Sequence, residues 1–488
     1  MSSLLSCSLV LFLLAPHAQA SSFKPNCTIP PPDTSYVSGP NVRGTTSILW
    51  NCLSIIFLCT WNIQHLNVPA QRPKAKGVFQ GIWWAILDSR KKIKWMIFTM
   101  LVPEYLVGKA FGEKLAAKSG VQVMEDNARK AGVGWDEIHA YMANMGYFVV
   151  NFSDVLEHNQ ADKSLRIAAF ENIISQFEGK FVQSNSINIT LQRFRHRCWA
   201  LNSNQLRFAS SEYLIDMPNI SSQELQKLDR GDKLAKVLAL IQITYLIVQL
   251  IARRVLGLPS TQLEIAALAF SASSLVTYVL YWSRPQGVDS VHVIKAKKLP
   301  DDSLLWHISD RGPAYLWTNP RTGSRLDEEL DLVPLPNDGA NFGRFISHGV
   351  AERLFKMLGR NLEIVPLAVG AVVGGTLFGG LHCLAWNFQF PTLDERLAWR
   401  VCSILTSSLP IVSLMLMVFW LRMNPRDALL RRNESPVSRF IVGSSLIILL
   451  LTYILARLFL MVEIFRSLFY LPPEAFIDTW SGNFPHFG

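Results

Sequence analysis

The sequence is poor in charged residues. Asp, Glu, Lys and Arg make up 17% of its 488 residues, whereas soluble domains carry about 25%. Half of the chain is hydrophobic and the mean hydropathy is +0.21. This composition argues against a soluble enzyme and predicts a protein with several membrane-spanning helices. The formal net charge of +10 comes mostly from loops beside apolar segments, where basic residues meet membrane lipid. Basic and aromatic residues do not alternate, so no nucleic-acid partner is expected.

The sequence also lacks the usual motifs of catalysis. It has no Asp-rich prenyl-diphosphate motif, no G-x-S-x-G, no Walker loop, no dinucleotide fingerprint and no H-x-x-x-H pair. Its seven cysteines include no C-x-x-C. We therefore expect neither a cofactor nor a metal. Cys27 and Cys198 are both expected outside the bilayer on one side, where they either form a disulfide or stay apart.

The N-terminus reads as a secretory signal over residues 1–20. Its apolar core is too short to span a bilayer and precedes Ala18-Gln19-Ala20, a cleavage site of the A-x-A kind. An uncleaved anchor is the alternative. Cleavage places residues 21–44 in the lumen, and the protein in the membrane of the endoplasmic reticulum or of another secretory-pathway compartment.

Apolar runs predict the fold class, an all-α membrane protein with about seven transmembrane helices and two larger extramembrane loops. Helices 1–2 fall in 45–112, helices 3–4 in 234–282 and helices 5–7 in 362–471, before a tail at 472–488. The predicted spans are 45–63, 93–112, 234–252, 263–282, 364–386, 401–421 and 440–463. The large loops are 113–233 and 283–361. Within the first loop, Ile138–Phe152 is apolar on part of its circumference and predicts an interfacial helix.

Seven spans after a luminal N-terminus place loop 113–233 in the lumen and the tail in the cytosol. Sequons at Asn26, Asn151, Asn188 and Asn219 are then candidates for glycosylation. The Arg-rich loop 422–439 would also be luminal, against the positive-inside rule.

Three ionisable residues inside predicted spans are candidate catalytic groups: Glu104, His382 and Arg457. Such residues are costly in hydrocarbon and mark interior sites. Glu104 follows Pro103, and either serves as an acid beside a cavity or forms a structural ion pair. Arg457 needs a partner from another helix, for which Glu104 is the candidate.

The segment before Trp386 is rich in glycine. Gly375, Gly379, His382 and Trp386 follow at spacings of four, three and four, on one helical face. They either form the wall of a substrate pocket or provide plain helix packing. At the start of the fourth span, Thr261 and Glu264 form a predicted capping box.

Four blocks carry a family resemblance: SILWNCLSIIFLCTWNIQHLNVP, QLEIAALAFSASSLVTYVLYWSRPQGV, GGLHCLAWNFQFPTLDERLAWR and ARLFLMVEIFRSLFYLPPEAF. Over residues 45–480 the chain resembles a large family of filamentous-fungal integral membrane proteins, mostly of unknown function. The resemblance points to specialised metabolism. The one chemistry associated with it is the intramolecular Diels–Alder step that forms the norbornene of sordarin-type diterpenoids. No residue roles are carried over.

Two functions are compatible with these observations. The first is a cofactor-free, membrane-embedded cyclase of Diels–Alder type that takes an apolar terpenoid from the bilayer. Such a reaction needs a shaped cavity and at most one hydrogen-bond donor, which suits a chain without catalytic motifs. The second is a non-enzymatic membrane protein, either a transporter or a sensor of small apolar molecules.

Overall fold

The computed structural model describes residues 43–71, 77–158, 194, 196–231, 233–310, 312, 314–315, 332–337, 339–340, 365–423 and 436–479. The predicted signal, Cys27, Asn26 and Asn188 lie outside these residues. The chain is mostly helical, with a few short strands.

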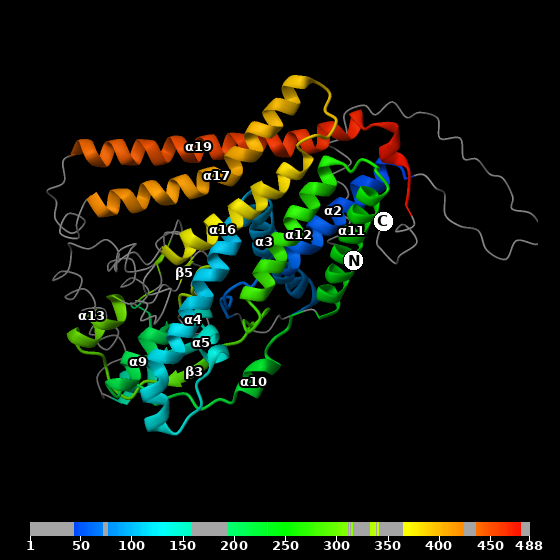
Figure 1. The fold of residues 1–488 in the computed structure, drawn as a ribbon. Helices are drawn as coiled ribbons and strands as arrows, with labels where there is room; N and C mark the ends of the chain where they lie inside the picture. The colour runs from blue at the N-terminus through cyan, green and yellow to red at the C-terminus, as the bar shows by residue number, and fades with distance from the viewer. Residues whose placement is uncertain are drawn as a thin grey trace, which may run out of the picture. The chain divides into compact units, whose positions relative to one another are not determined.

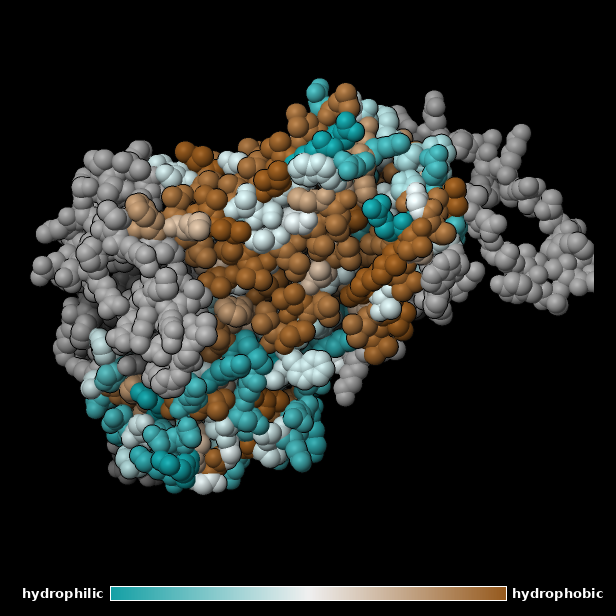
Figure 2. Space-filling view, in the orientation of Figure 1, coloured by the Kyte–Doolittle hydropathy of each residue, from teal (hydrophilic) through white to brown (hydrophobic). Residues whose placement is uncertain are grey.

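Five described helices are long and apolar enough to cross a membrane. They are α11 (Lys233–Val255), α12 (Gln262–Leu280), α16 (Val365–His382), α17 (Leu393–Met423) and α19 (Pro436–Arg466). These helices confirm that the five spans predicted between residues 234 and 463 are helical and apolar over the length of a membrane. Figure 1 shows α17 and α19 side by side, with α16 between α4 and α17. In Figure 2, hydrophobic residues cover the helices, while hydrophilic residues gather around α9 and α10.

The first two predicted spans are not among these five. Residues 45–63 form helix α2 (Thr45–Asn62), which packs on α11 and α12. The second predicted span, 93–112, is wrong as a single helix. Helix α3 (Val78–Leu101) ends at Val102, and α4 (Pro103–Ala131) begins with Pro103 at its first position. Proline cannot donate within a helix, and it disfavours helical backbone at the preceding residue.

The described parts of the two large loops form one unit of helices and strands, called the mixed unit below. Its sheet has the order β2-β1-β3, from β1 (Phe148–Asn151), β2 (Cys198–Ala200) and β3 (His292–Lys295). β1 pairs antiparallel with β2 and parallel with β3. Helices α5 (Glu137–Met145), α6 (Ser153–His158), α9 (Ser203–Ser211), α10 (Ser222–Lys227) and α13 (Asp302–Asp310) accompany the sheet, and β4 (Ala314–Tyr315) pairs with β5 (Gly339–Ala340). The fold is therefore not purely helical.

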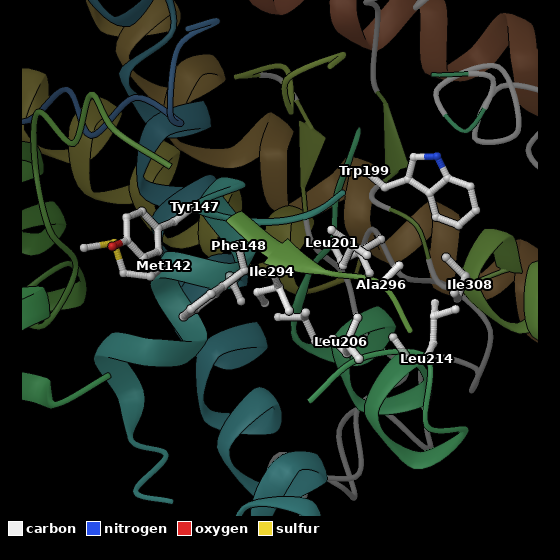
Figure 3. Close-up of a cluster of buried hydrophobic side chains, with 14 of the residues drawn as sticks. Met142, Tyr147, Phe148, Trp199, Leu201, Leu206, Leu214, Ile294, Ala296 and Ile308 are labelled. Atoms are coloured by element: carbon white, nitrogen blue, oxygen red, sulfur yellow. The ribbon is translucent and has the colours of Figure 1, made fainter. Parts of the chain in front are cut away.

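The predicted interfacial helix Ile138–Phe152 is wrong. Helix α5 ends at Gly146, whose φ of 87° is in the left-handed region, and strand β1 follows. Phe148 and Val150 are completely buried. They belong to an apolar core with Met142, Leu206 and Ile294, drawn in Figure 3. The apolar residues of this segment thus face protein and not lipid.

Glycines allow helices α4 and α16 to approach closely. A Cβ atom on Gly108 would lie 2.4 Å from the Leu367 carbonyl oxygen, and one on Gly370 would lie 2.8 Å from the Cα of Gly108. On the next face of α16, a Cβ on Gly379 would lie 2.5 Å from the Ser407 backbone nitrogen of α17. Small residues of this kind let membrane helices pack backbone to backbone.

The start of α12 is capped as predicted. Thr261 accepts from the Glu264 backbone N–H, and Glu264 accepts in return from the Thr261 N–H. Glu264 also forms a buried ion pair with Arg43, 2.5 Å from Nη1 to Oε1. Arg43 Nε donates to the Ala475 carbonyl at 2.8 Å. Both ends of the described chain therefore meet at this end of α12.

Replacing Gly379 by alanine should destabilise the protein by about 1–3 kcal/mol, because the added methyl group meets the α17 backbone. Gly380→Ala is the matched control, since its Cβ would meet only the Ser407 hydroxyl, at 3.8 Å. Thermal unfolding of the purified variants in detergent measures the difference. Equal melting temperatures for the two variants would contradict the packing described here.

Candidate functional site

The described membrane helices form an apolar cavity of about 320 Å³ that is open on one side. Its walls come from α16, α17 and α19, and include Ala371, Leu409, Pro410 and Leu450. Glu104, in the first turn of α4, and Tyr453 of α19 also line it. Ligand pockets start at about 300 Å³ and combine apolar walls with few polar groups. The cavity fits that pattern for a small apolar ligand.

Glu104 and Tyr453 form the polar side of the cavity. The Tyr453 hydroxyl donates to Glu104 Oε1 at 2.5 Å. Glu104 is 6% exposed, and its Oε2 atom has no hydrogen-bond partner. A buried polar atom without a partner costs about 1–3 kcal/mol. Oε2 is therefore the atom that a polar group of a ligand would satisfy.

Arg457 lies one turn beyond Tyr453 on α19. It is buried, and its Cζ atom lies 3.7 Å from the ring centre of Phe378 and 6.0 Å from that of Phe270. It forms no ion pair with Glu104 within 4 Å, and its Nε has no hydrogen-bond partner. The predicted pairing of Glu104 with Arg457 is thus replaced by the Tyr453 hydrogen bond. The guanidinium instead stacks on an aromatic ring of α16.

His382 is almost completely buried at the end of α16. Its Nδ1 lies 2.8 Å from the Phe378 carbonyl oxygen of the same helix, and its ring lies between those of Phe378 and Trp399. Trp399 Nε1 donates to the His382 carbonyl at 3.2 Å. His382 does not line the cavity. The Phe378 ring contacts both His382 and Arg457, and of the three candidates only Glu104 lines the cavity.

The predicted pocket wall on α16 is mostly helix packing. Gly379 contacts the α17 backbone, and a Cβ on Gly375 would lie 2.9 Å from Pro410 Cγ. Trp386 follows the end of the helix and is 36% exposed, with Arg400 stacked on its ring. None of the three lines the cavity. Pro410 and Tyr453 do, and the sequence reading missed both. An isolated tyrosine four residues before Arg457 was the available signal, because that spacing places both on one face.

The remaining predicted modification sites lie in the mixed unit. Asn151 belongs to β1, and its Oδ1 accepts from the Ser153 backbone N–H at 2.8 Å. Asn219 is exposed, and Cys198 is buried in β2. Among the described residues, no three His, Cys, Asp or Glu side chains are grouped as metal ligands.

A second buried polar cluster joins the membrane helices to the mixed unit. Glu113 of α4 pairs with Lys109 at 2.9 Å and with Arg284, and accepts from the Tyr281 hydroxyl at 2.5 Å. Arg284 Nη2 donates to Asn67 Oδ1 at 3.0 Å. Burial lowers the pKa of Arg284 to about 9. The sequence analysis missed Lys109 because the second predicted span, 93–112, covered it, and missed Glu113 because that residue was assigned to the loop 113–233.

His65 packs on this cluster, with its ring 4.8 Å from that of Tyr281. Burial, and then the nearby charge of Arg284, lower the pKa of His65 to about 3, and Lys236 and Lys109 act in the same direction. His65 is therefore neutral in the folded protein.

Acidification from pH 7 to pH 4 should reduce stability through His65. In the unfolded chain its pKa is about 6.5, so there it binds a proton that the folded protein excludes. The free energy of unfolding then falls by up to about 1.4 kcal/mol per pH unit. His65→Gln should lose this part of the pH dependence, measured as melting temperature against pH in detergent. The control His307→Gln, at a half-buried position of α13, should retain it. An unchanged pH dependence in His65→Gln would rule the effect out.

Comparisons with known proteins give a family but no activity. No curated protein and no solved structure matches the chain. The profile of a family of unknown function, DUF8562, matches residues 8–312, which include α2 to α13. This match covers more than half of the sequence, and the chain belongs to that family of unknown function.

Proposed function

We propose that the protein is a membrane-embedded enzyme of specialised-metabolite biosynthesis. It closes a ring in an apolar, terpenoid-like substrate by a cofactor-free Diels–Alder reaction. The membrane is that of the endoplasmic reticulum or another secretory compartment. The observation that carries the proposal is the apolar cavity between α16, α17 and α19 with the Glu104–Tyr453 pair on its wall.

The cavity supplies what a pericyclic closure requires. Aliphatic side chains such as Leu409 and Leu449 give the cavity an apolar surface that favours a compact shape of a flexible hydrocarbon. Holding two reacting carbon atoms within about 3–3.5 Å accelerates ring closure by pre-organisation alone. A chain of membrane helices also admits such a substrate directly from the bilayer.

The Glu104 carboxyl group supplies the polar contribution. Its Oε1 is held by the Tyr453 hydroxyl, so its Oε2 has a fixed position at the cavity. In its acid form, Glu104 donates from Oε2 to a conjugated carbonyl of the substrate. That hydrogen bond withdraws electrons from the dienophile, and it is strongest where charge develops in the transition state. Tyr453 is the positioning residue.

Glu104→Leu should lower the rate of ring closure roughly 10-fold or more, equivalent to about 1.4 kcal/mol, because the donor is lost while the apolar cavity remains. Tyr453→Phe should lower it less. Thr452→Val is the matched control, because Thr452 is half-buried on α19 and its hydroxyl bonds only to the Ile448 carbonyl of its own helix. Yeast microsomes containing each variant are incubated with a diene-bearing terpenoid aldehyde, and products are quantified against the uncatalysed closure.

Substrate binding to the same microsomes, measured with a photoreactive analogue, separates the alternatives. If wild-type protein changes neither the rate of ring closure nor the product ratio from the uncatalysed values, the cyclase proposal is refuted for that substrate. Binding without acceleration, abolished by Ala371→Trp in the cavity wall, would instead indicate the transporter or sensor.

A further inference from the structure

Different polar contacts mark the two ends of the bundle of described helices. At one end, Arg43 pairs with Glu264, and its backbone N–H donates to the Phe476 carbonyl at 2.9 Å. At the other end, Gln286 Nε2 donates to the Asn62 carbonyl at 2.8 Å. Helices α2 and α12 thus run parallel from the first end to the second. Their 18 and 19 residues span about 27–29 Å, the thickness of a hydrocarbon core. Helix α2 therefore crosses the membrane beside α12.

The chain after α2 remains at the second end. The Val68 N–H donates to the Met145 carbonyl at 3.1 Å, and Arg284 binds Asn67. Residues 64–71 therefore pack on the mixed unit that α5 and the strands form. Asn62 and Glu137 therefore lie on the same side of the membrane, and the chain between them crosses it either not at all or an even number of times.

Helix α3 cannot cross the membrane between these points. Its middle carries Asp88, Arg90, Lys91, Lys92 and Lys94, each costly in hydrocarbon. It lies obliquely across the end of α2, because Lys92 Nζ is 4.2 Å from the Trp61 ring centre while Thr99 binds Gln64 at 2.9 Å.

Helix α4 then leads back to the same side. Glu113 lies level with Tyr281 at the end of α12. Glu104 lies nine residues before Glu113 on α4, which places it about 14 Å deeper in the membrane than Glu113. Helices α3 and α4 form a re-entrant pair, and six described helices cross: α2, α11, α12, α16, α17 and α19.

The outer face of α3 suits a lipid surface. Phe79 is 91% exposed, and Ile82, Trp83, Ile86 and Ile97 are also exposed, at spacings that keep them on one stripe. Arg90, Lys91 and Lys94 are exposed as well. An apolar stripe with tryptophan and several basic residues is typical of a helix in the headgroup layer of an anionic leaflet.

We propose that α3 is a lipid-binding surface that lies on the anionic cytosolic leaflet. The mixed unit is then cytosolic, and Arg43 and the C-terminal segment are luminal. The positive-inside rule supports this side, because α3 carries Arg90, Lys91 and Lys94. On the opposite side, Arg253 is buried against backbone carbonyls.

Glycosylation in yeast microsomes tests the side. A glycan is expected on Asn26 and on a sequon tag fused after Gly488, and none on Asn151, Asn188 or Asn219. Mobility shifts after endoglycosidase H are compared among Asn26→Gln, Asn219→Gln and tagged chains. A glycan lost in Asn219→Gln, with an unmodified C-terminal tag, would overturn the proposal.

Lipid dependence tests the surface itself. The full chain is purified and placed in nanodiscs of phosphatidylcholine, with or without 30% phosphatidylserine. Phosphatidylserine should raise the melting temperature of wild-type protein by several degrees. Combined Arg90→Glu, Lys91→Glu and Lys94→Glu changes should abolish that rise, and glutamine at the same positions should reduce it. Changing exposed Lys118, Lys130 and Lys227 to Glu is the matched control and should preserve it. The absence of a rise in wild-type protein, or an equal rise in the α3 variant, would refute lipid binding by α3.

Discussion

The contact of α4 with α16 at Gly108 and Gly370 holds the centre of the molecule together. No side chain separates the two backbones there, so the first turn of α4 is fixed against the middle of α16. Pro103 allows α4 to begin at that depth, because the first position of a helix needs no N–H donor. As a result, Glu104 lies among membrane helices and not at their ends. The cavity between α16, α17 and α19 acquires its polar wall from this arrangement.

Buried charged side chains gather in two clusters, which differ in their place in the structure. Around Glu113, the carboxylate contacts Lys109, Arg284 and Tyr281, and Arg284 reaches Asn67 beyond them. Breaking such a network is costly because a charge is left without a partner. This cluster joins α4 and α12 to the mixed unit. Around Glu104, one carboxyl oxygen and the Nε of Arg457 remain without hydrogen bonds. We interpret the first cluster as structural because it joins several elements, and the second as a binding site because Glu104 lines the cavity.

Sequence reasoning succeeded where one local property decides the outcome. The five helices between residues 234 and 466 follow from apolar runs of bilayer length. The capping box at Thr261 follows from residue types three positions apart. Reasoning failed at residues 93–112, where hydropathy averaged over the segment concealed the break at Val102 and the ion pair at Lys109. It also failed at Ile138–Phe152, because an apolar segment reads alike whether it faces lipid or a protein core.

For the candidate site, too, some features were predictable from the sequence and others were not. The sequence by itself singled out Glu104 and Arg457, because an ionisable residue in an apolar run is conspicuous wherever it occurs. Only the tertiary structure decided that Tyr453 binds Glu104, that Phe378 stacks with Arg457 and that His382 bonds within its own helix. Hydropathy and capping are properties of neighbours along the chain. Which side chains meet across helices depends on where the helices cross, and glycine contacts set those positions, such as Gly108 against Leu367 and Gly374 against the Cα of Glu104.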